Sequence, residues 1–101
     1  MASSEQFYEL SDEADQDIEE IFDFTESNFG FDQAVEYLSK LEGVINQLVE
    51  NPEIGRTRNE IKVGLRSFPK SSHVIFYRIL TDRIRIVRVI HGSKDLPNFL
   101  K

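Results

Sequence analysis

Cationic, imidazole and phenolic side chains between residues 60 and 91 have the chemistry to act on a phosphodiester. Attack of a 2′-hydroxyl on phosphorus needs a base, a cation that stabilises the added negative charge, and an acid for the leaving oxygen. The most suitable residues for these roles are Arg66, Arg85 and His91. Further candidates of the same chemical types are Glu60, His73, Tyr77, Arg83 and Arg88. These residues keep a ribonuclease open as one candidate function.

Each of these residues also has an ordinary structural interpretation. His91 would end a strand and bond to backbone, and His73 would begin the preceding strand in an exposed position. The arginines would be surface residues or partners of acidic groups on the first helix, since a buried guanidinium needs a partner. Tyr37 and Tyr77 are typical of core residues with a polar tip.

Other kinds of chemical site find little support in the sequence. The chain has no cysteine, so it forms neither a disulfide nor a thiolate site. No cluster of His, Asp and Glu has metal-ligand spacing, and we expect no metal ion or other cofactor. Gly55-Arg56 is not a phosphate-binding loop, because it has one glycine and no following Lys-Ser.

The elements that must position these residues form a predicted sheet over residues 61–91. Residues 72–80 and 84–91 are rich in β-branched and aromatic residues and flank a turn at Thr81-Asp82, which predicts a hairpin. Residues 61–68 form a further strand candidate, followed by a turn at 69–71. Both faces of the hairpin are apolar: we expect Val74, Phe76 and Leu80 opposite Ile75, Tyr77 and Ile79, and Ile84, Ile86 and Ile90 opposite Val87 and Val89.

Two amphipathic helices precede this sheet. A short strand at 7–10 leads to Ser11, a good N-cap, and an apolar stripe then runs to Phe29, with Gly30 ending the helix. Asp32 is the expected cap of a second helix, which stops at Asn51-Pro52. The short loop between them predicts an antiparallel helical hairpin that covers one face of the sheet. The other face would keep an apolar groove, a candidate binding site.

The whole chain, residues 1–101, is expected to be one α+β domain of order β-α-α-β-β-β with a small, mainly antiparallel sheet. Residues 1–53 hold 15 acidic residues and one basic residue, a net charge of −14, whereas residues 54–101 hold 11 basic and three acidic residues, a net charge of +8. Such asymmetry suggests a charged partner. Without an apolar membrane span or a secretory signal, we expect a cytoplasmic protein.

Several segments, in this order and spacing, resemble the ParE toxins of bacterial ParDE toxin–antitoxin modules, within the RelE/ParE superfamily. They are YELSDEADQDIEEI at 8–21, FGFDQAVEYLSKLE at 29–42, NPEIGRTRNEIKVGLRSF at 51–68, HVIFYRI at 73–79 and IRIVRVIHGSKD at 84–95. The resemblance covers nearly the whole chain and implies a helical hairpin packed on a small, mainly antiparallel sheet.

The resemblance also implies a function. ParE-like proteins inhibit DNA gyrase and are held inactive by a ParD-like antitoxin, in a hetero-oligomer, so we expect a binding toxin, not an enzyme, with no membrane and no specific nucleic-acid binding of its own. Acidic helices that mimic nucleic-acid charge towards gyrase are a further hypothesis. The expected partner-binding residues are Arg66, Phe68, Tyr77, Arg85 and Arg88, with the tail 95–101 as a contributor to target poisoning.

The alternative is a ribosome-dependent messenger endoribonuclease of RelE type, with Arg66, Arg85 and His91 as its catalytic residues. RelE-like nucleases tend to place an aromatic residue after the histidine, where this chain has Gly92. The catalytic lysine-rich segment of RelE is reduced to Lys62 and Lys70, and a net charge of −6 opposes binding of a polyphosphate chain. A degenerate member that retains only antitoxin binding is a third candidate.

Overall fold

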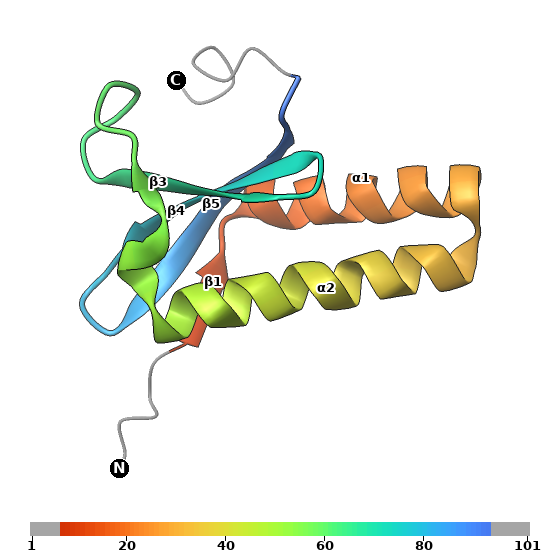
Figure 1. The fold of residues 1–101 in the computed structure, drawn as a ribbon, viewed down its shortest axis with the longest axis horizontal. Coiled ribbons are helices and arrows are strands. Elements are labelled where there is room, and N and C mark those ends of the chain that lie inside the picture. The colour runs from red at the N-terminus through yellow and green to blue at the C-terminus, as the bar shows by residue number, and fades with distance from the viewer. Residues whose placement is uncertain (1–6, 94–101) are drawn as a thin grey trace.

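The computed structural model describes residues 7–93, which form a helical hairpin packed on one face of a sheet (Figure 1). The elements in chain order are β1 (Phe7–Leu10), α1 (Asp12–Phe29), α2 (Phe31–Glu50), the 3-10 helix η2 (Pro52–Ile54), β2 (Arg56–Thr57), β3 (Leu65–Lys70), β4 (His73–Ile79) and β5 (Arg83–His91). No helix in this described range is long and apolar enough to cross a membrane.

The sheet has the order β1-β5-β4-β3-β2. Strand β1 runs parallel to β5, with Leu10 opposite Ile86, and the other neighbouring pairs are antiparallel. The predicted α+β class and mainly antiparallel sheet are therefore confirmed. The two-residue strand β2 was not predicted, because Arg56-Thr57 lies in a polar connector without a strand pattern.

The helix boundaries follow from capping. The Ser11 hydroxyl accepts a hydrogen bond from the Ala14 N–H at 2.9 Å, as predicted for an N-cap. Gly30, at φ 96°, closes α1 and also stands at the N-cap position of α2, so a single residue joins the helices. The predicted cap at Asp32 is wrong, since α2 begins at Phe31 and Asp32 lies in its first turn.

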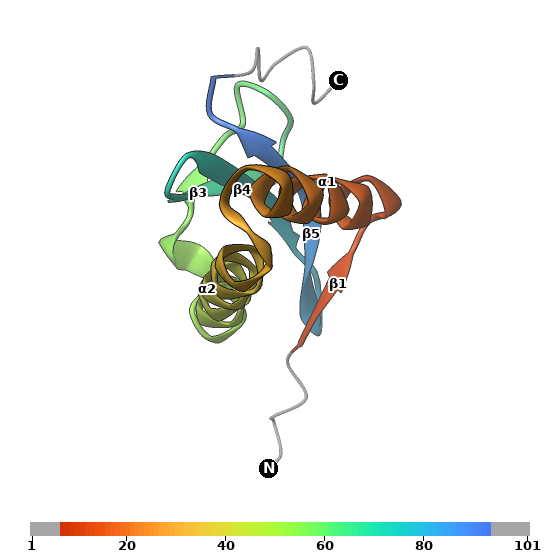
Figure 2. The same cartoon turned by 90° about the vertical axis from the view of Figure 1, so that its right-hand side faces the viewer.

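The core lies mainly between the hairpin and one face of the sheet, which we call the helix face. Figure 2 views the two helices end-on with the sheet behind them. The helix-face core includes Ile21, Leu41, Ile45, Leu48, Ile75, Tyr77, Ile86 and Val89. A second, smaller cluster of Leu65, Phe76 and Ile90, with Ile61, Val74 and Val87 beside it, lies on the back face.

The predicted strand at 61–68 is wrong in its first half. Residues 58–64 form turns, with Gly64 at φ 86° and the Arg58 N–H donating to the Leu65 carbonyl at 2.8 Å, so β3 begins only at Leu65. Pro69 and Lys70, predicted as a turn, belong to β3. Pro69 is tolerated because it lies beyond β2, where no strand among the described residues pairs with that edge of β3.

The predicted faces of 84–91 are wrong at the end of the strand. Phe76 pairs with Arg88 and Tyr77 pairs with Ile86, so Val87 is an extra residue, a β-bulge. The bulge reverses the alternation, which places Val89 in the helix-face core and Ile90 in the back-face cluster. A count of alternate residues cannot detect this shift.

Candidate partner-binding surfaces

Tyr77, one of the residues expected at a partner-binding surface, is fully buried. Its hydroxyl donates to the Pro52 carbonyl at 2.6 Å and accepts from the Gly55 N–H at 3.0 Å. Burial raises the pKa of Tyr77 above its ordinary value, so the phenol stays protonated. The expected role at an exposed surface is therefore wrong for Tyr77, and its interpretation as a core residue with a polar tip is confirmed.

Arg66 binds the same segment after α2 that Tyr77 binds. It pairs across the strands with Tyr77, and its Nη1 donates to the carbonyls of Gly55 at 2.7 Å and Glu53 at 3.2 Å. Carbonyls at the end of a helix need external donors. Arg66 and Tyr77 supply these donors and so fix the segment that leaves α2 onto the sheet.

Arg88 faces α1. Its guanidinium donates from Nε to Asp17 Oδ2 at 2.8 Å and from Nη2 to Asp17 Oδ1 at 2.9 Å. Asp17 Oδ2 also accepts from the Val89 N–H at 2.9 Å, so this carboxylate supports the backbone beside the bulge. The hydrogen bonds that Arg88 donates to the Asp17 carboxylate raise the pKa of Arg88. The interpretation of this arginine as a partner of an acidic group on the first helix is confirmed.

Arg85 lies on the back face with Arg83. Glu9 of β1 accepts from both, at 2.8 Å from Arg83 Nε and in a short contact with Arg85 Nη1. Hydrogen bonds from Arg85 and Arg83 hold the pKa of Glu9 below its usual range. These arginines are half-exposed and remain accessible to a partner.

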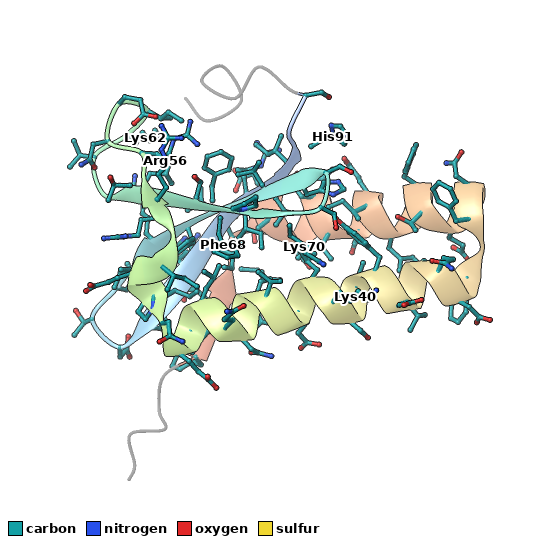
Figure 3. The ribbon with its side chains drawn as sticks, in the orientation of Figure 1. Lys40, Arg56, Lys62, Phe68, Lys70 and His91 are labelled. Carbon is teal, nitrogen blue, oxygen red and sulfur yellow. The ribbon has the colours of Figure 1, made fainter. Side chains whose placement is uncertain are left out.

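The remaining expected residues are spread over the molecule. Phe68 is half-buried and packs from β3 against the helix-face core, as Figure 3 illustrates. His91 ends β5, where its Nδ1 lies 2.7 Å from the Ser93 hydroxyl and 3.1 Å from the Ser93 N–H. The five expected partner-binding residues therefore do not share one surface. The nuclease candidates are also separated, because Arg85 is on the back face. His91 pairs with His73 of β4, which pairs with Lys70 of β3, and Arg66 lies four positions along β3 from Lys70.

A small polar cluster does form around His73. Its ring meets His91 edge-on, with centroids 5.5 Å apart, and its Nδ1 lies 2.7 Å from the Tyr37 hydroxyl. Burial and the neighbouring His91 lower the pKa of His73. Both histidines line a groove of about 390 Å³ between α1 and the end of the hairpin β4–β5, together with Asp17, Glu20, Ile21, Phe24, Thr25, Arg88, Val89 and Ile90.

A second groove, of about 330 Å³, follows the opposite side of the helical hairpin. Its walls come from β1 and both helices and are mostly apolar: Tyr8, Leu10, Ile18, Phe22, Val35, Leu38, Ser39, Leu41, Glu42 and Ile45. A neighbouring hollow shares Ile18, Phe22 and Leu38 and adds Glu19 and Asp23. We call the two together the hairpin groove. The sequence signal for it is the density of apolar residues on both helices, which exceeds what one sheet face can cover.

The described residues contain no group of three or more His, Asp or Glu side chains that could hold a metal ion. Neither groove thus offers a metal centre from the described part of the chain. Both combine apolar walls with a few charged side chains.

Residues 8–96 match the family model of the ParE toxin of the type II toxin–antitoxin system parDE. The chain therefore belongs to the ParE toxin family.

Among its relatives, Toxin ParE1 of Mycobacterium tuberculosis (strain H37Rv) is 41% identical over 94 residues, which cover 92% of this chain and 96% of that protein. Toxin ParE1 of Caulobacter vibrioides is 35% identical over 88 residues, covering 87% and 91%. A solved structure described as the chromosomal ParDE TA system from P. aeruginosa has a TM-score of 0.76 at 17% identity, covering 90% of this chain and all of that one. This structure supports the fold.

Proposed function

We propose that this ParE-family toxin inhibits DNA gyrase by binding to it, and that a ParD-like antitoxin neutralises it. Family membership supports the target and the antitoxin. The observation that favours binding over catalysis is the separation of Arg66, Arg85 and His91, together with the structural use of Arg66 by the carbonyls of Glu53 and Gly55. General acid–base catalysis needs these groups within reach of one phosphate.

The hairpin groove is our proposed seat for an antitoxin helix. Amphipathic helices bind in apolar grooves through residues spaced three and four apart. The walls supply Leu10, Ile18, Phe22 and Leu38 for such residues, and the carboxylates of Glu19, Asp23 and Glu42 line the rim. The occupying helix would carry aliphatic anchors flanked by lysine or arginine.

The accessible residues of the expected partner-binding set remain part of this proposal. Arg66 and Phe68 lie on the helix face, Arg88 contacts Asp17 of α1, and Arg85 lies on the back face. An antitoxin segment that leaves the groove and continues around the sheet with acidic and apolar residues would find partners there. Tyr77 is left out, because its hydroxyl is buried against Pro52 and Gly55.

A supercoiling assay tests the target. Purified toxin is expected to inhibit gyrase and to accumulate cleaved DNA, with topoisomerase IV as the control enzyme. Addition of the antitoxin encoded beside the toxin gene is expected to restore supercoiling. If a folded toxin leaves gyrase unaffected at a large molar excess, gyrase is not its target.

The ribonuclease alternative rests on one specific observation, the pairing of His73 and His91 in a groove beside Arg88. Cleavage of messenger RNA on ribosomes that disappears in His91→Ala while the protein stays folded would favour it. Arg66→Ala is a poor test, because Arg66 holds the segment after α2 to the sheet and its loss disturbs the fold.

A further inference from the structure

The back face of the sheet carries a cross-strand pair of like charges. Arg78 of β4 stands directly opposite Arg85 of β5, and directly opposed residues share a face of the sheet. Arg78 also lies two positions along β4 from Phe76, a member of the back-face cluster. Like charges that oppose each other in this way destabilise a sheet, so the pair costs stability unless an anion lies beside it.

The carboxylates of the protein compensate this pair only in part. Glu9 accepts hydrogen bonds from both Arg83 and Arg85, so one carboxylate serves two guanidinium groups. Within the described part of the chain, the Arg78 guanidinium pairs with no carboxylate and donates from Nη1 to the neutral Val63 carbonyl at 2.8 Å. A guanidinium has five N–H donors. Arg78 therefore keeps donors for an anion that comes from outside.

Further cations extend the pair towards β2. Arg56 stands opposite Ser67, which in turn stands opposite Phe76, so Arg56 belongs to the back face. The Ser67 hydroxyl accepts from Arg58 Nη1 at 3.1 Å, and the Arg58 guanidinium lies over the Phe76 ring, 5.8 Å from its centroid. Lys62 lies beside Arg56 (Figure 3). We call the following six cations the basic face: Arg56, Arg58, Lys62, Arg78, Arg83 and Arg85.

The basic face has a surplus of positive charge. Among the described residues, the carboxylates that pair with it are Glu9, Glu60 and Asp82. Six cations and three carboxylates leave a net charge of +3 for this set. Neighbouring strands lie about 4.8 Å apart, so the row from Arg56 on β2 through Arg78 on β4 to Arg85 on β5 is about 14 Å long.

Charge and geometry indicate which anion fits this row. Guanidinium groups on a rigid sheet suit the regularly repeated phosphates of a nucleic-acid backbone, because arginine binds phosphate through paired N–H donors. A second copy would have to bind head to tail, which extends into rings or filaments. An antitoxin helix already has its proposed seat in the hairpin groove. We propose that the basic face contacts the phosphate backbone of the double-stranded DNA that the target enzyme holds.

Such a contact agrees with an accumulation of cleaved DNA. A ligand shifts an equilibrium only by its difference in affinity for the two states. A toxin that touches the enzyme and its DNA together stabilises complexes in which the DNA is held, and the cleaved complex is one of these. The net charge of −6 opposes binding to free DNA, so the contact needs the enzyme. The inference rests on the proposed function, since it adds DNA as a second component of the surface that gyrase presents.

The test uses variants that remove cations from the basic face. Arg56→Gln and Lys62→Gln are combined, because both side chains are exposed. Arg78→Gln removes one cation of the like-charge pair, and Arg78→Lys keeps the charge at that position. The matched control is Lys40→Gln, which removes a cation that pairs with Glu36 on α2. The substituted positions lie outside the residues proposed to bind the antitoxin.

The main readout is the affinity for purified gyrase, with and without a linear DNA fragment, at several salt concentrations. DNA is expected to tighten the binding of the unmodified toxin. In the presence of DNA, the slope of log K against log salt is expected to fall by about two in the double variant and by about one in Arg78→Gln, since each phosphate contact contributes about 0.9. Both variants are expected to accumulate less cleaved DNA.

The controls separate this contact from other effects. Arg78→Lys and Lys40→Gln are expected to keep the slope of the unmodified toxin. Binding to gyrase without DNA and binding to the antitoxin are expected to stay unchanged in every variant. Circular dichroism and thermal unfolding verify that each variant is folded.

An unchanged slope in both variants would overturn the inference and leave gyrase as the target. Weaker antitoxin binding with an unchanged slope would assign the basic face to an acidic antitoxin segment instead. Self-association of the unmodified toxin that the double variant abolishes, again with an unchanged slope, would assign it to a second copy. If the unmodified toxin binds gyrase neither with nor without DNA, the proposed function fails and the inference fails with it.

Discussion

At the scale of single residues, the main lesson comes from Tyr77 and Arg66. Both belong to polar types that suggest binding or catalysis, yet both use their polar groups on the chain's own backbone. Their partners are Pro52, Glu53 and Gly55, which precede them by 11 to 25 positions. Local sequence patterns do not contain such pairings, so the partners of these residues could not be predicted.

Gly55→Ala is expected to destabilise the protein. A Cβ at this position would overlap the Tyr77 hydroxyl and the ring carbons next to it, and Tyr77 is fully buried with no room to move. Overpacking of this kind costs about 1–3 kcal/mol of unfolding free energy, measurable by urea denaturation. Gly43→Ala is the control: Gly43 lies in the exposed part of α2 with open space around it, so alanine should stabilise by about 0.5–1 kcal/mol. Equal stability of the two variants would contradict this account.

The stability of the protein is expected to fall on mild acidification because of His73. Burial lowers the pKa of His73 in the folded protein below 6.5, the ordinary value that it regains on unfolding. Between these two pKa values the unfolded chain binds more protons than the folded protein does. The contribution of neutral His73 to the free energy of unfolding is therefore complete above pH 6.5 and is lost as the pH falls towards the folded pKa. Urea denaturation at several pH values measures the slope. His73→Gln should reduce it, and an unchanged slope would exclude His73 as the cause.

At the scale of elements, the helices and the extent of strand β5 were predictable, whereas the bulge within β5 was not. Ser11, Gly30 and the apolar stripes mark the helices because capping and burial act over a few residues of the same segment. The bulge at Val87 depends on another element. The Ser11 N–H donates to the Ile86 carbonyl at 3.0 Å, and the Ser11 hydroxyl donates to the Val87 carbonyl at 2.7 Å. Ser11, the N-cap of α1, thus supplies hydrogen-bond donors to two backbone carbonyls at the bulge.

The candidate binding surfaces were also predictable only in part. The apolar surplus on both faces of 72–91 predicted that binding surfaces would remain, but the grooves are lined largely by helix residues such as Ile18, Phe22 and Leu38. Their exposure depends on how far the sheet extends along the hairpin, and helical periodicity does not report that length. The phenylalanines at 22 and 24 are visible in the sequence, whereas their division between the two grooves is not.

Asp17→Asn is expected to weaken the junction of α1 with β5. The carboxylate serves Arg88 and the Val89 N–H together, and its side chain is 11% exposed. An amide would turn N–H groups towards the guanidinium and remove the carboxylate that accepts from both Nε and Nη2 of Arg88, at a cost of about 2–3 kcal/mol. Chemical denaturation measures the loss. Glu36→Gln, which removes the exposed pair with Lys40, should change stability by less than about 0.5 kcal/mol. A similar small effect for Asp17→Asn would mean that the bulge needs no carboxylate.

At the scale of the whole molecule, the fold separates its charges and its surfaces. The helical hairpin carries exposed carboxylates, with exposed Phe29 and Phe31 at the turn between the helices, while Arg56 and Lys62 lie together at the opposite end (Figure 3). The hairpin groove lies between the two ends. If the antitoxin binds in the hairpin groove, as proposed, substitutions at either end of the molecule are expected to leave neutralisation unchanged.

The position of β5 in the sheet determines when the protein can become toxic. Strand β1 pairs with β5 across a sequence separation of 76 residues. The hydrogen-bond partners of Ser11 and Asp17 also lie on β5. Translation proceeds at roughly 5–20 residues per second, so the chain spends several seconds on the ribosome before its first strand can find a partner. The helices bury their apolar residues in a core that they share with β4 and β5, so they lack that packing until these strands have been made. The order of synthesis therefore leaves an interval in which the toxin exists as a chain but not as a fold. Under the proposed function, a ParD-like antitoxin present in that interval would meet the toxin as it forms.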